Sequence, residues 1–430
     1  YAATGNTAIG YLAGNVMTTG ASSVIIGGYA GDAITSGTAQ TLVGDSAGGA
    51  ITTGGYNVFV GFQAGDAVTT VSSLVAVGAS ALGANTSGTS NTAVGRSAGA
   101  SIISGSNNTC IGHEAGVAVT TADGMTLVGT TCGDAITTAT NNTAVGYNAG
   151  KDITTGNNNT CIGEIAGGAI TTASDLVAIG QNSLSSNTTG ANNVAVGVNA
   201  VDACTTGNHL VGIGYQALSA VTTAQFNIGI GKDAGLLIST GDGNTVIGYH
   251  SGDAITTGTY NTCLGTNSGG GITTGTYSVC IGNSAGGGAI TGSHNILIGH
   301  ATGDAVTSGN NNVAIGQGAF TTATSGANNV ALGAETLYYQ TTSSNNTALG
   351  HGAGKATTTA TSNVVVGAYS GDALTTGSNN VFVGYHSGGA TNTAAENTAV
   401  GDAALQLNTT GAYNTAIGRN ALAANTTADQ

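Results

Sequence analysis

The sequence repeats itself every 17 residues from near its start to its end. The repeat reads approximately Asn-Thr/Val-Ala-Ile/Val-Gly-x-x-Ala-Gly-x-Ala-Ile-Thr-Thr-Gly-x-Asn, and its first copy begins at Asn6. From there to Gln430 the chain holds 25 consecutive units without insertion or deletion. A fixed period of this size is typical of a solenoid, whose units stack on one another and are not stable alone. We therefore predict one repetitive all-β domain over residues 1–430, a parallel β-solenoid or β-roll with 17 residues per coil.

Composition supports an ordered stack and limits the partners. The chain has 75 glycines but no proline, whereas flexible linkers are usually rich in both. A stack of strands gains from the absence of proline, because every backbone N–H can then join a ladder. With 19 acidic and only 5 basic residues, for a net charge of −14, we expect no binding to nucleic acid. No apolar run approaches the ~20 residues of a membrane span, and no cofactor motif is present.

The repeats can be aligned with one another, and we number their positions 1 to 17 with Asn6 at position 1. Position 5 is glycine in all 25 units, which predicts a corner with positive φ or a very close backbone approach. The first five of these corner glycines are Gly10, Gly27, Gly44, Gly61 and Gly78. Position 1 is Asn in 18 of the 25 units, which suits a ladder of asparagines hydrogen-bonded from coil to coil.

Positions 2 and 4 carry β-branched or aliphatic residues in every unit, so they share one face of a strand. We predict that this face fills the coil interior. At position 4 the first members of this predicted core are Ile9, Ile26, Val43, Val60 and Val77.

Position 3 points to the opposite face and never carries a polar side chain. A strand that is apolar on both faces is buried on both faces. We therefore predict that position 3 forms a seam between identical chains in a homotrimer, with end-to-end joining into a filament as a further alternative. The bulkiest residues of this predicted interchain seam are Ile25, Leu42, Phe59, Leu127, Leu297 and Phe382.

The run Asn-Thr-Ala-Val-Gly-x-x-Ala at residues 91–98 and 142–149 resembles the head repeats of trimeric autotransporter adhesins. The segment 414–427 is similar to the 17-residue repeats of phage tail fibres. The resemblance covers nearly the whole chain. It implies a left-handed parallel β-roll that associates as a trimer around an apolar axis and serves as a spacer or adhesive shaft.

Several residue patterns suggest chemistry, but each has a simpler interpretation. The Gly-x-Ser-Ala-Gly runs around Ser46, Ser97 and Ser284 look like nucleophile elbows, yet nothing predicts the helix and partner histidine that an elbow needs. Aspartates recur at position 10, as at Asp32 and Asp66, and solvated turns explain them better than calcium sites. Four of the six cysteines occupy position 3, and a Cys263–Cys280 disulfide is a minor alternative to two free thiols. We predict no catalytic or metal site.

Eight Asn-x-Ser/Thr sequons make glycosylation of a secreted fibre a further hypothesis. They lie at Asn85, Asn107, Asn141, Asn158, Asn187, Asn345, Asn408 and Asn425. The Thr-Thr pairs at positions 13 and 14 also raise the alternative of an ice-binding solenoid, although adjacent threonines on a strand point to opposite faces.

These observations together predict a non-enzymatic structural protein that forms a fibre or filament outside a cell or on a virion. A phage tail-fibre shaft or adhesin head that contacts a cell-surface receptor or glycan is the alternative within the same architecture. Positions 6 and 7 vary freely, and we expect them to form the exposed corner that would make such contacts.

Overall fold

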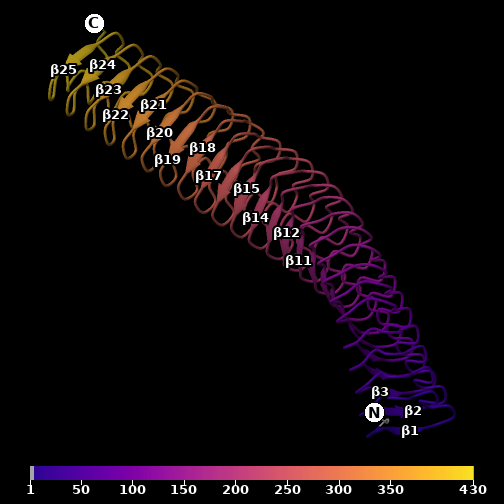
Figure 1. Cartoon of the computed structure of the whole chain (residues 1–430). Coiled ribbons are helices and arrows are strands. Elements are labelled where there is room, and N and C mark those ends of the chain that lie inside the picture. The colour runs from indigo at the N-terminus through magenta and orange to yellow at the C-terminus, as the bar shows by residue number, and fades with distance from the viewer. Residues whose placement is uncertain (1–3, 430) are drawn as a thin grey trace. The chain divides into compact units, whose positions relative to one another are not determined.

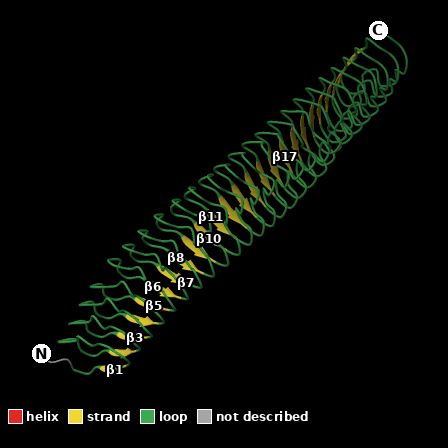
Figure 2. Ribbon diagram, turned by 90° about the vertical axis from the view of Figure 1, so that its right-hand side faces the viewer, coloured by secondary structure: helices red, strands yellow, loops and turns green. Residues whose placement is uncertain are grey.

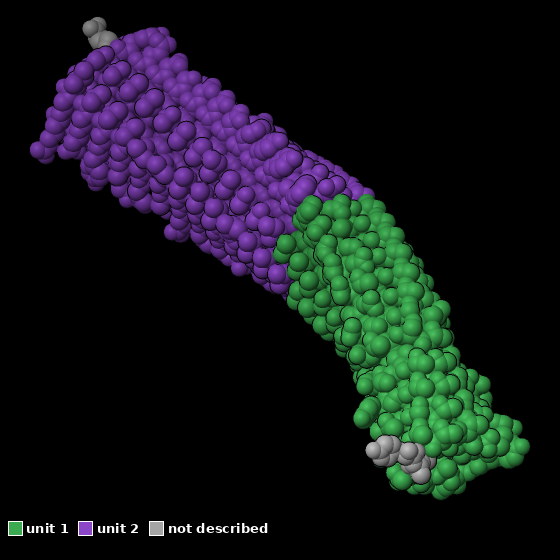
Figure 3. Space-filling view, viewed as in Figure 1, with its two compact units in different colours: residues 1–212 green, residues 213–430 purple. Residues whose placement is uncertain are grey.

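The computed structural model describes residues 4–429. It is an all-β protein, a parallel β-solenoid with one three-residue strand in each 17-residue coil (Figure 1). The chain divides into two compact units, Tyr1–Gly212 and Ile213–Gln430 (Figure 3). The predicted fold class and repeat length are therefore confirmed, whereas a single domain over the whole chain stays a prediction.

Each strand covers positions 2 to 4 of its repeat. In the first unit the strands are β1 (Thr7–Ile9), β2 (Val24–Ile26), β3 (Thr41–Val43), β4 (Val58–Val60), β5 (Val75–Val77), β6 (Thr92–Val94), β7 (Thr109–Ile111), β8 (Thr126–Val128), β9 (Thr143–Val145), β10 (Thr160–Ile162), β11 (Val177–Ile179) and β12 (Val194–Val196). In the second unit they are β14 (Ile228–Ile230), β15 (Thr245–Ile247), β16 (Thr262–Leu264), β17 (Val279–Ile281), β18 (Ile296–Ile298), β19 (Val313–Ile315), β20 (Val330–Leu332), β21 (Thr347–Leu349), β22 (Val364–Val366), β23 (Val381–Val383), β24 (Thr398–Val400) and β25 (Thr415–Ile417). The strand β13 (Val211–Ile213) contains the boundary between the units.

Within each unit, consecutive strands pair in parallel and in register, so identical repeat positions stack (Figure 2). Thr41 pairs with Val58 and Val43 with Val60, for example. Backbone hydrogen bonds also join the loops of adjacent coils, as from Gly48 N–H to the Ala64 oxygen at 2.9 Å. Each coil is therefore tied to its neighbours around much of its circumference, as expected for a solenoid stabilised by nearest-neighbour interfaces.

The structure reverses the predicted orientation of the strands. From β2 to β25 the central residue of every strand is buried within its own chain. The predicted interchain seam is thus the core of the coil, with all six residues 0% exposed: Ile25, Leu42, Phe59, Leu127, Leu297 and Phe382. The predicted core at position 4 instead lies on the outer face, where Ile9 is 59% exposed and Ile26, Val43, Val60 and Val77 are half-buried.

The physical reason for this orientation is a match in size between positions 3 and 9. A Cβ added to Gly65, at position 9, would lie 2.4 Å from Phe59 Cε2, and one added to Gly388 would lie 2.7 Å from Phe382 Cδ2. Where position 9 is Leu, as at Leu82, position 3 of that coil is Ala76. The two positions therefore share one interior space, and a bulky residue at either position fills it.

The glycines at position 5 have the geometry of the predicted corners. The φ angles of Gly10, Gly27, Gly44, Gly61 and Gly78 lie between 134° and 140°. A Cβ on Gly10 would lie 2.4 Å from the Gly27 oxygen, and a Cβ on Gly27 would lie 2.3 Å from the Gly44 oxygen. Both the backbone angle and the close approach of the next coil exclude any other residue at this point.

The asparagines at position 1 form the predicted ladder inside the coil. Asn261 is fully buried and its Nδ2 donates to the Gly275 carbonyl oxygen at 2.8 Å, across its own coil. Its Oδ1 accepts from the Ser278 N–H of the next coil at 3.0 Å, while Nδ2 also reaches Asn244 Oδ1 at 3.1 Å. Each asparagine thus satisfies backbone groups at the start of the strand and at the opposite turn.

Candidate functional site

The outer face of the strands carries two parallel columns of side chains, at positions 2 and 4. Both columns consist of Thr, Val, Ile or Leu throughout, and no repeat has a charged residue at positions 1 to 5. These side chains are half-buried to exposed, as shown by Val24 at 40%, Leu332 at 40% and Leu349 at 43%. We call positions 2 and 4 the outer strand face. It presents a neutral, largely aliphatic surface with a regular repeat along each unit.

Exposed aromatic side chains border this outer strand face. We call positions 17 and 6, which precede and follow the strand, its two rims. The aromatic residues at position 6 are Tyr11, Phe62, Tyr147, Tyr215, Tyr249 and Tyr385, and those at position 17 are Tyr56, Phe226, Tyr260, Tyr277 and Tyr413. Sequence reasoning identified the corner at positions 6 and 7 but missed this enrichment. The signal was the position of the tyrosines relative to the strand.

One charged cluster lies at a corner of the second unit. Lys232 Nζ lies 3.1 Å from Asp233 Oδ2, and His250 Nε2 lies 3.4 Å from the same oxygen. The other ring nitrogen of His250, Nδ1, lies 2.9 Å from Asp253 Oδ2. The hydrogen bond to Asp233 raises the pKa of Lys232. Asp233 is only 5% exposed and its Oδ1 has no hydrogen-bond partner, so the cluster holds its carboxylate through one oxygen.

Asp32 and Asp66 occupy position 10 in two coils of the first unit, and Gly49 occupies the same position in the coil between them. A Cβ on Gly49 would lie 3.1 Å from Asp66 Oδ1 and 3.7 Å from Asp32 Oδ1. Burial raises the pKa of Asp66, and the charge of Asp32 raises it further. Across residues 4–429 no group of three or more His, Cys, Asp or Glu side chains could hold a metal ion.

The cysteines are free and buried, and they behave as small apolar residues. Cys263 and Cys280 face each other in register on β16 and β17, yet both remain thiols. Burial raises the pKa of Cys161 to about 12 and that of Cys204 to about 11. Thiols with such pKa values are not nucleophilic at neutral pH.

The serines of the elbow-like runs lie at position 7. Ser46, Ser97 and Ser284 have φ between 54° and 56°. Ser46 Oγ donates to Asp45 Oδ2 at 3.4 Å, and Ser284 Oγ donates to Asn283 Oδ1 at 3.3 Å. These contacts do not supply the base that would activate a nucleophile.

The structure separates the eight predicted glycosylation sites into two groups. Asn85, Asn187 and Asn408 occupy position 12 inside the coil and are 0% exposed, so their prediction as glycan acceptors is wrong. Their side chains instead satisfy the backbone, as when Asn187 Nδ2 donates to the Gly190 oxygen at 2.7 Å. Asn425 lies at the same position of the last coil and is half-buried. The sequons at position 17 are exposed, and they are Asn107, Asn141, Asn158 and Asn345.

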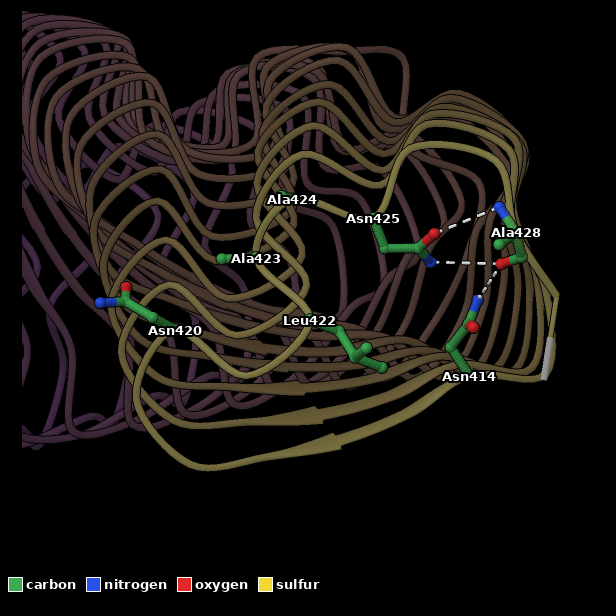
Figure 4. Close-up of a pocket in the computed structure, with 7 residues that line it drawn as sticks. All are labelled: Asn414, Asn420, Leu422, Ala423, Ala424, Asn425 and Ala428. Carbon is green, nitrogen blue, oxygen red and sulfur yellow. Dashed lines mark hydrogen bonds between the residues drawn. The ribbon is translucent and has the colours of Figure 1, made fainter.

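An apolar hollow lies on the last coil and is lined by residues of the coil interior (Figure 4). Leu422 projects into it, beneath Ala423 and Ala424. Asn414 Nδ2 and Asn425 Nδ2 both donate to the Ala428 oxygen, at 2.9 and 3.2 Å. These are the same contacts that fill internal coils, so the hollow has no chemistry of its own.

No known protein family matches the chain, and no characterised protein matches it either. Among residues 4–429 there is no helix that is both long and apolar enough to cross a bilayer. The outer strand face and its rims are therefore the feature on which a function can be based.

Proposed function

We propose that this chain is a non-enzymatic structural protein, the shaft of a fibre outside a cell or on a virion. In this proposal three parallel copies associate around an axis through their outer strand faces. The observation that carries the proposal is that positions 2 and 4 hold only Val, Ile, Leu or Thr, without a charged residue, on a half-buried to exposed surface. The trimer expected from sequence is retained, but its contact surface moves from position 3 to positions 2 and 4.

The extent of the face supports a stable association. Twelve strands spaced by about 4.8 Å and three residues wide present about 550 Å² in each unit. Soluble monomers rarely expose apolar patches beyond a few hundred Å².

The repeat of the face favours a copy of the same chain as its partner. Only a partner with the same spacing between apolar groups can stay in register over twelve successive strands. A second copy has this spacing because it has the same coils. The absence of charge at positions 1 to 5 gives a charged partner nothing to pair with.

Position 6 borders the contact between copies in this assembly, whereas position 7 remains outside it. The varied polar and aromatic side chains of position 7 could then contact a cell-surface receptor or a glycan, as expected of a tail-fibre shaft or an adhesin head.

The test is the native mass of the protein by light scattering, with one variant on the face and one off it. Ile247→Glu places a charge at position 4, where the side chain is 37% exposed. Thr257→Glu places the same charge at exposed position 14 of that coil. We expect a mass of three times 40.9 kDa for the parent and for Thr257→Glu, and a monomer for Ile247→Glu. A monomeric parent overturns the proposal, and masses that climb without limit replace the closed trimer by an end-to-end filament.

A second candidate function is ice binding, and one observation favours it. From β6 to β10 position 2 is Thr in five consecutive coils. The aliphatic column at position 4 runs beside these threonines, separated from them by the inward-pointing position 3. The Thr-Thr pairs at positions 13 and 14 fit less well, because position-13 hydroxyls such as Thr154 Oγ1 already donate to the next coil. Thermal hysteresis at micromolar concentration is the measurement, and its absence removes this candidate.

A further inference from the structure

The outer strand face of the second unit cannot by itself fix how far one copy is shifted along another. From β14 to β25 position 4 is always Ile, Val or Leu, and position 2 is always Ile, Val or Thr. A shift by one coil would replace each aliphatic contact with another of nearly the same size. When a uniform pattern makes several registers equally favourable, only a residue outside that pattern can distinguish them.

The rims of the second unit contain such an aperiodic element. On the position-17 rim, Tyr260, Tyr277 and His294 form one stack, with ring centroids 5.1 Å apart and interplanar angles of 15° and 16°. Tyr260 and Tyr277 are 54% and 53% exposed. Beyond this stack the rim continues with Asn311, Asn328 and Asn345, which are much smaller.

The position-6 rim carries its own aromatic group at nearly the same level. Lys232 Nζ lies 5.9 Å from the ring centroid of Tyr215 and 5.3 Å from that of Tyr249. The contact with Asp233 holds this ammonium in place. The rim then changes to the smaller residues Thr266 and Asn283. Each rim thus carries its bulky residues at uneven intervals, with one group near β15 to β17 and others farther on, at Tyr385 and Tyr413.

The two rims are complementary in size at β15, β16 and β17, whereas at β14 the flanking residues Phe226 and Lys232 are both large. Gly243 precedes β15 and Tyr249 follows it, so the smallest residue of one rim shares a strand with a bulky residue of the other. At β16 the bulky residue is Tyr260, on the position-17 rim, and the small residue is Thr266, on the position-6 rim. The arrangement is the same at β17, between Tyr277 and Asn283.

We propose that these rim residues, Tyr249, Tyr260 and Tyr277 with their small counterparts, fix the axial register between copies of the chain. The inference rests on the proposed trimer. In a cyclic trimer each position-6 rim meets the position-17 rim of the next copy. In register, Tyr249 then meets the space over Gly243, and Tyr260 and Tyr277 meet Thr266 and Asn283. A shift by one coil sets Tyr249 against Tyr260 instead, and the rings overlap.

The test uses disulfide cross-linking between copies with cysteines placed at position 4. Val366→Cys, Val383→Cys and Val400→Cys are conservative in size and lie on three consecutive strands. The six native cysteines are at most 1% exposed and do not compete. Chains with different cysteines and different tags are co-expressed and oxidised. We expect each introduced cysteine to cross-link with the same position of another copy and not with a neighbouring strand.

The register should slip when the complementary rim is removed. In the variant Tyr249→Ser, Tyr260→Ser, Tyr277→Ser, we expect the offset product between Val383→Cys and Val400→Cys to rise about tenfold relative to the in-register product. Tyr260→Phe with Tyr277→Phe keeps the rings and should keep the register. The matched control is Tyr339→Ser, which removes an exposed ring that lies against Tyr338, at positions 11 and 10 of their coil and away from both rims.

The outcomes separate this inference from the proposed function. A triple serine variant that stays trimeric and cross-links only in register overturns the role of the rims and leaves the trimer intact. A parent protein that is trimeric but slips as freely as the variant also overturns it. A parent that forms no cross-links between copies at position 4 overturns the proposed assembly itself.

Discussion

The shared interior space of positions 3 and 9 makes a quantitative prediction about two substitutions at β4. Phe59 is fully buried, and its replacement by Ala should cost about 3–5 kcal/mol in the free energy of local unfolding. Gly65→Leu should also destabilise, because the new Cβ would lie 2.4 Å from Phe59 Cε2. Overpacking of this kind costs about 1–3 kcal/mol, and the left-handed φ of 61° at Gly65 adds about 1 kcal/mol.

The double variant Phe59→Ala, Gly65→Leu should be much less destabilised than the sum of these costs. Leu occupies position 9 opposite Ala76 at Leu82, with a φ of 50°, so the backbone accepts this arrangement. We expect an interaction energy of about 3 kcal/mol in favour of the double variant. The Phe382 and Gly388 pair of the second unit, with a 2.7 Å approach, should give the same result.

Hydrogen exchange followed by mass spectrometry is the appropriate assay, because coils of a solenoid open locally and a single unfolding temperature would average over the units. Peptides that cover residues 57–78 report the opening free energy of the substituted coil. Costs that simply add, within about 0.5 kcal/mol, would mean that the two side chains do not share a space. That result would refute the assignment of position 3 to the interior.

Three further predictions concern the asparagine ladder, the aspartates and the cysteines. Asn261→Ala leaves the Ser278 N–H and the Gly275 oxygen without their partner. It should cost about 1–3 kcal/mol of local stability, measured by hydrogen exchange. Asn261→Leu should cost less, because position 1 already holds leucine at Leu74 and Leu176. Burial and the charge of Asp32 raise the pKa of Asp66 in the folded state above the ordinary aspartate value of 3.8. Asp66 therefore favours folding at acidic pH, and this contribution to stability is lost as the pH rises through the folded-state pKa. Asp66→Asn should therefore stabilise its coil at neutral pH. Hydrogen exchange measured over a pH series should show that this gain in stability vanishes as the pH falls to the ordinary aspartate pKa. A gain in stability that persists in acid would exclude a charge effect. Native protein should leave all six thiols unmodified by iodoacetamide, since burial raises the pKa of Cys110 and Cys132 to about 12, and rapid labelling before unfolding would contradict their burial.

The period and the glycines were sufficient to predict the coil. Gly10 and Gly27 need positive φ and have no room for a Cβ, and this requirement is visible in the sequence because no unit departs from it. The asparagine ladder was predictable for a similar reason, since an amide that repeats at coil spacing can satisfy both its own coil and the next. Local requirements that act identically in every coil thus leave an unambiguous pattern.

The orientation of the strand could not be read from alternation, because both faces are apolar. Position 3 ranges in size from Gly229 to Phe59, and its assignment to the seam followed only from its place opposite positions 2 and 4. The deciding signal lay elsewhere in the repeat. Phe59 and Phe382 have glycine at position 9 of their coils, while Leu82 and Leu405 at position 9 have alanine at position 3. Only side chains that compete for one closed space must compensate each other in this way.

The same reasoning gives meaning to the uniformity of the outer strand face. A column that faced only water would be free to accept polar and charged residues, as position 7 does at Glu114 and Glu335. Position 4 accepts only Ile, Val and Leu in 25 units, although Ile111 and Leu349 are 38% and 43% exposed in the single chain. The interior shows that variable sizes require a compensating neighbour in the same chain, and position 4 has none. A surface of constant size and no charge is what a partner with the same constant repeat requires, and this argument is the strongest support for association with further copies of the chain.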